Sequence, residues 1–394
     1  MKKFIALLLA AVMMLSFTGC ANNDIIAKIK NFNLVDFLNK EPDWNKVKVD
    51  ELLTGSPVKY YFNRLGNKEK QAYNDILSKI DTMPDSIEIP SLNQTELTTV
   101  FEALLYDNPY LFFLGRSCTI TKRGLKNYFN AQYIMTASQY SKKKKQLQDK
   151  ANAIIAALGK KSQLETEFYI HNFIVNNCSY ENNGNDDEST AYGALINKKA
   201  ACEGYSKAAK VLFDIAGIEC YVVSGMSENF QGKLESHMWN IVKINGNYYH
   251  LDLTWDDPVT LGQSSLNDPR YTYFNVTDKE ISKTHSGFHS TNACTAAAAN
   301  YYVFSGLYFT GYNAAVQSQL AEKLAASINK GGSKIEFKFS SPAVYSQAFK
   351  GLFGKQQVYD IINVANRSTS KDLSKLSVSY VQNKDFNIIE LIVK

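Results

Sequence analysis

Three residues of this chain have the types and the order of a cysteine-based acyl-transfer site. They are Cys202, His237 and Asp252. A thiolate attacks a carbonyl carbon, an imidazole takes and later returns the proton, and a carboxylate orients the imidazole and stabilises its charge. The set therefore predicts Cys202 as nucleophile, His237 as its base and Asp252 as the orienting group.

The segment around Cys202 should place this thiol at the start of a helix. Helical spacing of apolar residues predicts a helix over Ala201–Ala216, and Gly217 is well placed to end it. The unpaired N–H groups and the dipole at a helix N-terminus favour a thiolate. Gly204 lets another backbone segment approach the first turn closely. The position of Cys202 thus suits a reactive thiol.

A predicted hairpin should bring the other two residues together. Strands are expected over Met238–Ile244 and Tyr248–Leu253, with a tight turn at Asn245-Gly246 between them. This pairing would place His237 and Asp252 side by side. With a further strand over Cys220–Ser224, one helix followed by an antiparallel sheet indicates an α+β fold. His250 would share the strand face of Asp252 and could compete for a catalytic role.

Three short runs carry a resemblance to a known family. The runs Cys-Glu-Gly-Tyr-Ser at 202–206, His-Met-Trp-Asn at 237–240 and Asp-Leu-Thr-Trp-Asp at 252–256 resemble the core motifs of the transglutaminase-like superfamily, in the same order. Segments 191–195 and 273–276 resemble its bacterial members. The resemblance covers about a quarter of the chain. Because the Trp-Asn context belongs to His237, this residue is favoured over His250.

The resemblance has consequences for fold and chemistry. It implies a papain-like core with the nucleophile on a helix and the His and Asp on adjacent strands. It also implies reactions through a thioacyl-enzyme, namely transamidation, deamidation or peptide hydrolysis. The backbone N–H of Cys202 is the expected oxyanion donor, with Tyr192 as a candidate for the second.

Each of the three residues also has a purely structural interpretation. Cys202 could be a buried cysteine, His237 an edge histidine and Asp252 a turn or cap residue. Their occurrence together, in register with three motifs, favours the catalytic interpretation. The alternative for the whole protein is a catalytically idle binding module for wall polymer or protein.

The remaining cysteines and histidines suggest no metal centre and no cofactor. The histidines His171, His285 and His289 do not have metal-ligand spacing. The cysteines match neither a CxxC pair nor a zinc pattern: Cys20, Cys118, Cys178, Cys202, Cys220 and Cys294. If Cys20 is lipidated, an odd number remains, so at least one thiol must stay free or pair between chains.

The first twenty residues resemble an export signal. Lys2 and Lys3 precede the apolar run Phe4–Phe17, which is too short to span a bilayer comfortably, and Thr18-Gly19-Cys20 follows. This end resembles a bacterial lipobox, with Phe17 where Leu is usual. It predicts that Cys20 is lipidated and becomes the N-terminus of a protein held outside the cytoplasm on the cell membrane. Ordinary secretory cleavage is the alternative.

The chain is long enough for several domains, and its composition supports a real core. We expect a signal peptide at 1–19, a lipid-anchored tether at 20–57, a mostly helical accessory domain at 58–160, a catalytic domain at 161–290 and a small α+β domain at 291–394. Accessory helices are predicted over Lys68–Ile80, Gln94–Tyr106 and Ser138–Leu158, with strands at Tyr110–Leu114 and Ala131–Thr136.

Composition also limits the partners. The net charge is +5, and the one basic run, Lys142–Lys145, lies in a predicted helix and is best explained as a solvated face. Nucleic acid is therefore not an expected partner. The sequence predicts a cell-surface lipoprotein that acts on amide bonds of a protein or peptide, cell-wall peptide included, as peptidase, deamidase or transamidase.

Overall fold

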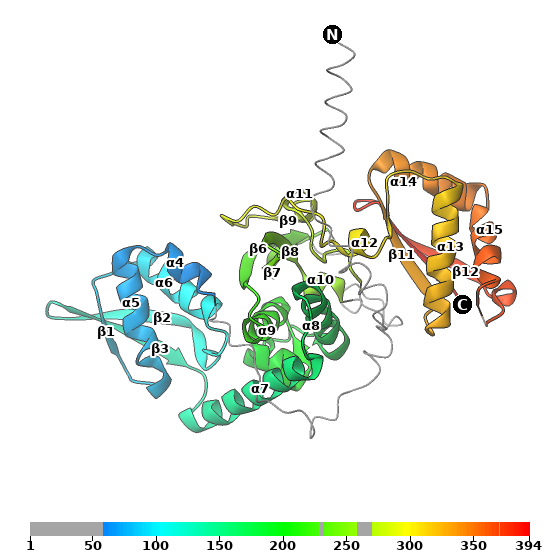
Figure 1. The fold of residues 1–394 in the computed structure, drawn as a ribbon. Helices are drawn as coiled ribbons and strands as arrows, with labels where there is room; N and C mark the ends of the chain where they lie inside the picture. Colours follow the sequence, from blue (N-terminus) through cyan, green and yellow to red (C-terminus); the bar gives the residue numbers. More distant parts are fainter. Residues whose placement is uncertain (1–57, 229–231, 258–269, 370) are drawn as a thin grey trace, which may run out of the picture. The chain divides into compact units, whose positions relative to one another are not determined.

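The computed structural model describes residues 58–394 apart from 229–231, 258–269 and 370. Predictions for the signal peptide, Cys20 and the tether lie outside the described residues. The described part forms two compact units, residues 58–297 and 298–394 (Figure 1). Within it, no helix is both long enough and apolar enough to cross a bilayer.

The first segment of the larger unit contains four α-helices, of which all but the first were predicted. They are α4 (Tyr60–Arg64), α5 (Asn67–Leu77), α6 (Gln94–Asp107) and α7 (Ala137–Leu158), with a short 3-10 turn at Ile80–Thr82. Asn93 and Thr136 begin α6 and α7 with reciprocal capping boxes, which fix where these helices start. The three helix predictions are confirmed.

The same segment also contains a three-stranded sheet, most of which the sequence pattern did not predict. Strands β1 (Ile87–Ile89), β3 (Lys126–Tyr133) and β2 (Leu114–Arg123) form it in that order, all antiparallel. The strand predicted over Tyr110–Leu114 is wrong, because 110–113 form turns and only Leu114 belongs to β2. The polar, mostly exposed sequence of β2 has no apolar alternation, so its pairing with β3 stabilises it instead.

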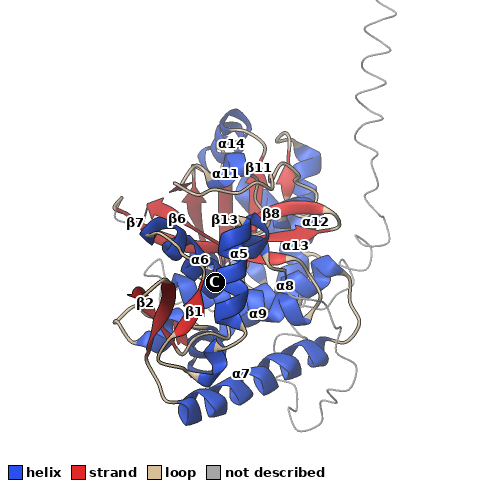
Figure 2. Ribbon diagram, turned by 90° about the vertical axis from the view of Figure 1, so that its left-hand side faces the viewer, coloured by secondary structure: helices blue, strands red, loops and turns tan. Residues whose placement is uncertain are grey.

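The core of the larger unit packs helices on an antiparallel sheet. The sheet order is β8 (Asn247–Leu251), β7 (Leu234–Ile244), β6 (Cys220–Glu228) and β9 (His285–Ser286). Helix α9 (Cys202–Ile215) contacts β6 and β7, and α8 (Gln163–Asn177) and α7 lie beside it (Figures 1 and 2). The central part of α9, from Gly204 to Phe213, is buried, which fixes the helix and its first residue relative to the sheet.

Short elements complete this core. Strands β4 (Ser179–Tyr180) and β5 (Lys199–Ala200) pair in parallel just before α9. Between them lie a 3-10 turn, Asp186–Ser189, and a π-helical turn, Gly193–Asn197. Helices α10 (Leu253–Asp256) and α11 (Asp278–Ile281) follow β8.

The predicted hairpin is confirmed, with one correction. Asn245 and Gly246 both have positive φ, 50° and 85°, as a type I′ turn requires, and β7 pairs with β8 around them. Strand β8 ends at Leu251, however, so Asp252 is not a strand residue. It is the N-cap of α10, which places the carboxylate at the junction between strand and helix.

Residues 298–394 form a separate α+β unit. Its sheet order is β10 (Tyr308–Phe309), β11 (Lys334–Phe339), β13 (Ile388–Val393) and β12 (Val378–Asn383). Its helices are α12 (Tyr301–Phe304), α13 (Ala314–Asn329), α14 (Pro342–Phe349) and α15 (Gln357–Asn366), with α13 and α15 side by side (Figure 1). A π-helical turn, Lys350–Gly354, separates α14 from α15 near the predicted break, and a 3-10 turn lies at Leu373–Lys375.

Candidate active site

The structure brings Cys202, His237 and Asp252 together. His237 Nε2 lies 2.7 Å from Asp252 Oδ2, and the two side chains are 6% and 0% exposed. Cys202 is half-buried at the first residue of α9, and its sulfur lies close enough to the His237 ring to raise the pKa of that imidazole. Because Nε2 faces the carboxylate, Nδ1 is the ring nitrogen that remains for the sulfur.

Electrostatics favour a charged His237. Burial by itself lowers the pKa of this imidazole, but the Asp252 carboxylate and the Cys202 sulfur outweigh that effect and raise the pKa to about 10. Burial would raise the pKa of Asp252, yet His237 and His285 hold it well below its usual range. A buried imidazolium–carboxylate pair is therefore the stable state near neutral pH.

Asp252 accepts hydrogen bonds on both oxygens. Its Oδ1 accepts the backbone N–H groups of Thr254 and Trp255 at 3.0 and 3.2 Å, as the N-cap of α10. Its Oδ2 lies 2.7 Å from His237 Nε2 and 3.0 Å from His285 Nε2. Asp252 is thus a cap residue and the partner of the histidine at once, and four donors converge on one carboxylate.

The first turn of α9 is fixed by a close backbone approach. A Cβ on Gly204 would lie 2.4 Å from the carbonyl oxygen of Glu188, which also accepts the N–H of Ala201 at 2.8 Å. Only glycine fits there. Ala201, the N-cap, offers no side-chain acceptor, so the N–H groups of the first turn are not capped by a side chain.

Two further motif residues tie this helix to the sheet and to the Asp252 segment. Asn240 on β7 donates to the carbonyl oxygen of Ser206 at 3.0 Å. The hydroxyl of Tyr205 donates to Asp257 at 2.6 Å, just beyond α10. These buried contacts help to hold Cys202, His237 and Asp252 at fixed separations. They give Tyr205 and Asn240, the motif residues close to Cys202 and His237, a structural role.

Side chains from β2 and α7 also hold the loop that contains Glu188. Arg116 on β2 bonds to Ser189 and forms an ion pair with Glu203 at 3.0 Å. Lys143 on α7 contacts both carboxylate oxygens of Asp187 at 2.7 Å. The loop that touches Gly204 is therefore held from outside the motifs.

The remaining histidine and tyrosine candidates lie elsewhere. His250 is buried, with Nδ1 accepting from Trp239 Nε1 at 2.9 Å and Nε2 at 2.8 Å from Asp278. Since both ring nitrogens are engaged, His250 does not compete with His237. The hydroxyl of Tyr192 bonds to Gln146 on α7 at 2.9 Å, so it serves that contact.

Tyr180, which sequence reasoning missed, lies within electrostatic range of the thiol. Burial and then the charge of Cys202 raise its pKa to about 12. The signal that could have found it is its place on a strand that pairs with the segment just before Cys202.

One cluster of side chains beside this site has the composition of a metal-ligand set. His250, Asp278 and Cys294 place ligand atoms close together. Because Trp239 donates to His250 Nδ1, the neutral ring carries its proton on Nε2 and offers Asp278 a donor there. The cluster is explained as a hydrogen-bonded group without an ion.

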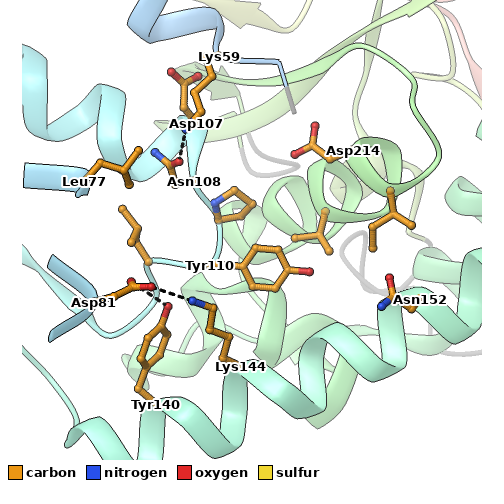
Figure 3. Close-up of a pocket in the computed structure, with 14 residues that line it drawn as sticks. Lys59, Leu77, Asp81, Asp107, Asn108, Tyr110, Tyr140, Lys144, Asn152 and Asp214 are labelled. Atoms are coloured by element: carbon orange, nitrogen blue, oxygen red, sulfur yellow. Dashed lines mark hydrogen bonds and ion pairs between the residues drawn. The ribbon is translucent and has the colours of Figure 1, made fainter. Parts of the chain in front are cut away.

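A cavity of about 570 Å³ lies at the other end of α9. Figure 3 shows Tyr110 in it, with Lys144, Asn152 and Asp214 around it. Asp214 lies near the C-terminal end of the helix that begins with Cys202, so this cavity is separate from the three residues.

A family model matches the part of the chain that contains these residues. Residues 149–253 match the family model described as the transglutaminase-like superfamily, and Cys202, His237 and Asp252 all lie inside the match. This segment of the chain is a transglutaminase-like core. His285 lies beyond it. No curated protein matches the chain.

Two solved structures show similarity to part of the chain. One is described as a TGase, with 17% identity over 42% of this chain and 48% of its own, at a TM-score of 0.24. The other is a candidate cysteine protease from Cytophaga hutchinsonii, with 10% identity over 44% of this chain and 73% of its own, also at 0.24. The present chain thus spans about half of the first of these proteins.

Proposed function

We propose that this protein is a cysteine enzyme that cleaves or transfers amide bonds through a thioacyl-enzyme at Cys202. The observation that carries the proposal is the buried His237–Asp252 pair at 2.7 Å, next to a cysteine at the uncapped start of a helix. A transglutaminase-like core supports the same class of chemistry.

The chemistry follows from the positions of these groups. The Cys202 sulfur attacks the amide carbonyl carbon, a C–S bond forms, and the carbonyl electron pair moves to oxygen. The backbone N–H of Cys202, at the start of α9, stabilises this oxyanion. When the tetrahedral adduct collapses, the C–N bond breaks and the leaving amine takes the proton from His237.

The second half of the reaction restores the thiol. Water or a second amine gives a proton to His237 and attacks the thioester, and the C–S bond breaks. Asp252 remains ionised throughout, orienting the ring and balancing its charge. Whether water or an amine enters decides between hydrolysis and transfer. The substrate class is a protein or peptide, cell-wall peptide included.

Product analysis tests the proposal. The protein is incubated with a peptide library, with and without a primary amine, and the products are identified by mass spectrometry. Peptide cleavage or deamidation indicates hydrolysis, and an amine adduct indicates transfer. The Cys202→Ser variant is the control. Equal product from the variant, or none from the native protein, argues for the idle binding module.

Alkylation provides a test that needs no substrate. Burial raises the pKa of Cys118 to about 11 and of Cys178 to about 12, and raises those of Cys220 and Cys294 as well. We expect iodoacetamide at pH 6 to label Cys202 before these four thiols in the folded protein. Slow, equal labelling of all five would count against a nucleophilic cysteine.

We also propose that the protein is a lipoprotein anchored at Cys20 on the outer side of the cell membrane. The lipobox-like run Phe17–Cys20 supports this. A Cys20→Ser variant should be released from washed membranes, and its retention would contradict the anchor.

A further inference from the structure

His285 reaches the same carboxylate as His237, from a different strand. It lies on β9, where it pairs with Ser227 of β6, while His237 on β7 pairs with Gly225 of β6. Positions 225 and 227 share one face of the sheet, so the two imidazoles point to the same side. Their ring centroids are 5.2 Å apart.

The glycine between the two histidines makes this convergence possible. A Cβ on Gly225 would lie 2.7 Å from the carbonyl oxygen of Ser286 and 2.8 Å from the Trp239 ring. Without a side chain there, β9 joins the sheet edge, and Trp239 packs edge-on against His285 at 4.9 Å. The ring of His285 is therefore enclosed and fixed.

Both nitrogens of His285 are engaged. Nδ1 lies 2.9 Å from the hydroxyl oxygen of Thr284, which lies 3.2 Å from that of Tyr273. Nε2 lies 3.0 Å from Asp252 Oδ2. Burial lowers the pKa of His285 despite the nearby carboxylate, which supports a neutral ring that donates Nε2–H to Asp252 and accepts from Thr284.

We propose that His285 is a positioning residue that locks the Asp252 carboxylate so that His237 presents Nδ1 to Cys202. The proposal rests on the proposed function of this site. One oxygen of Asp252 is already held by two backbone N–H groups, and His285 supplies the donor that fixes the other beside His237. The carboxylate then has no free rotation.

Neither a base role nor a metal role fits His285. It is turned to Asp252 and Thr284, so it does not receive the thiol proton. His237, Asp252 and His285 place ligand atoms close enough for an ion, but the carboxylate already accepts four donors. The hydrogen bonds account for the cluster.

Charged and titratable groups surround this site on every element packed against it. They include Cys202 on α9, His250 on β8, Asp278 on α11, and Asp256 on α10, whose pKa burial raises well above its usual range. A pH titration of the site would therefore report on several of these groups at once and would not isolate His285. A geometric test of the hydrogen bond itself is more direct.

Two amide substitutions provide that test. In His285→Gln, the side-chain NH₂ can reach the position of Nε2 and donate to Asp252. In His285→Asn, the shorter side chain reaches only the Nδ1 position. Both remove the buried ring, and Asn leaves the larger space, so a role confined to packing would change the melting temperature but not the hydrogen bond between His237 and Asp252. Thermal melting of both variants serves as the control for folding.

The readouts are the NMR signal of the His237 Nε2–H proton and the iodoacetamide rate of Cys202 in the full chain. We expect His285→Gln to retain the signal and to label within about threefold of the native rate. His285→Asn should lose the signal and label at least about tenfold more slowly, as expected when one hydrogen bond to a charged group is lost.

The proposal is overturned if the two variants give the same NMR signal and the same labelling rate. It is also overturned if His285→Asn retains more of the signal or labels faster than His285→Gln. The NMR readout does not depend on turnover. If the native protein makes no product while the two variants still differ as expected, the proposed function fails and the positioning role stands.

Discussion

Replacing Asp252 by Asn probes the charge of the pair with almost no change of shape. Asn is also a good N-cap, so its oxygen can keep the backbone N–H groups of Thr254 and Trp255. Its NH₂ group would then face His237 Nε2, where the native carboxylate accepts. The ring must accept at Nε2 and carry its proton on Nδ1, the wrong tautomer for taking a proton from Cys202.

The size of the effect follows from the two opposing influences on His237. The carboxylate and the sulfur raise its pKa to about 10, whereas burial, the largest single influence, lowers it. Without the carboxylate, burial dominates, and the pKa should fall below the ordinary 6.5. A fall from about 10 to 6.5 is 3.5 × 1.36, or on the order of 5 kcal/mol, and more than a thousandfold in the protonation equilibrium.

Alkylation of Cys202 at pH 7 measures the loss of the counter-charge. We expect Asp252→Asn to slow labelling nearly as much as His237→Ala does, with Asp256→Asn as a nearby buried control. From the sequence alone, Asp252 should matter less than His237, because it does not touch the thiol. Labelling of Asp252→Asn at the native rate would refute the argument that burial makes the imidazolium depend on this carboxylate.

The same pair should stabilise the fold over a defined pH window. The folded pKa of His237 is raised, so its contribution is complete below about 6.5 and is lost as the pH rises through about 10. The folded pKa of Asp252 is depressed, so its contribution is present above the ordinary 3.8 and is lost as the pH falls. Native and Asp252→Asn proteins should therefore differ most in unfolding free energy between about 4 and 6.5 and converge near 10.

Two further outcomes are expected. Gly204→Ala should destabilise the fold by about 1–3 kcal/mol in denaturant unfolding and slow the labelling of Cys202, because the added Cβ meets the Glu188 carbonyl. Gly311→Ala is the control, because its Cβ meets open space, and it should change neither quantity. Equal effects of the two substitutions would contradict the argument that Gly204 permits a close backbone approach. If turnover requires the imidazolium, kcat/KM for the peptide products should decline as the pH passes about 10, and an unchanged rate at pH 11 would contradict this.

Local signals predicted much of the site. The start of α9 at Cys202 and the turn at Asn245-Gly246 were both predictable, because helix ends and type I′ turns depend on a few adjacent residues. Those two features place the cysteine and the histidine. The position of Asp252 was predicted only approximately, since a chain leaving a strand can continue it or start a helix, and here the carboxylate itself caps the helix.

Other features had no local signal. His285 reaches Asp252 through β9, a strand of only two residues separated from β8 by a long connection. The sequence analysis judged His285 only by the spacing of metal ligands, and this criterion does not detect a histidine that donates to a carboxylate. Strand β2 was missed for a related reason, since its register comes from β3 and not from its own apolar pattern.

The position of Cys202 depends on more of the chain than the three motifs. Cys202 sits where α9 begins, and Gly204 lets the Glu188 carbonyl approach that turn. The same loop is held by Arg116 on β2 and Lys143 on α7, and both residues precede the matched segment 149–253. A fragment limited to the core would lose both contacts, so its thiol should be less well fixed than in residues 58–297. The segment that precedes the matched core therefore helps to position Cys202 in the candidate active site, even though it supplies no candidate reacting group.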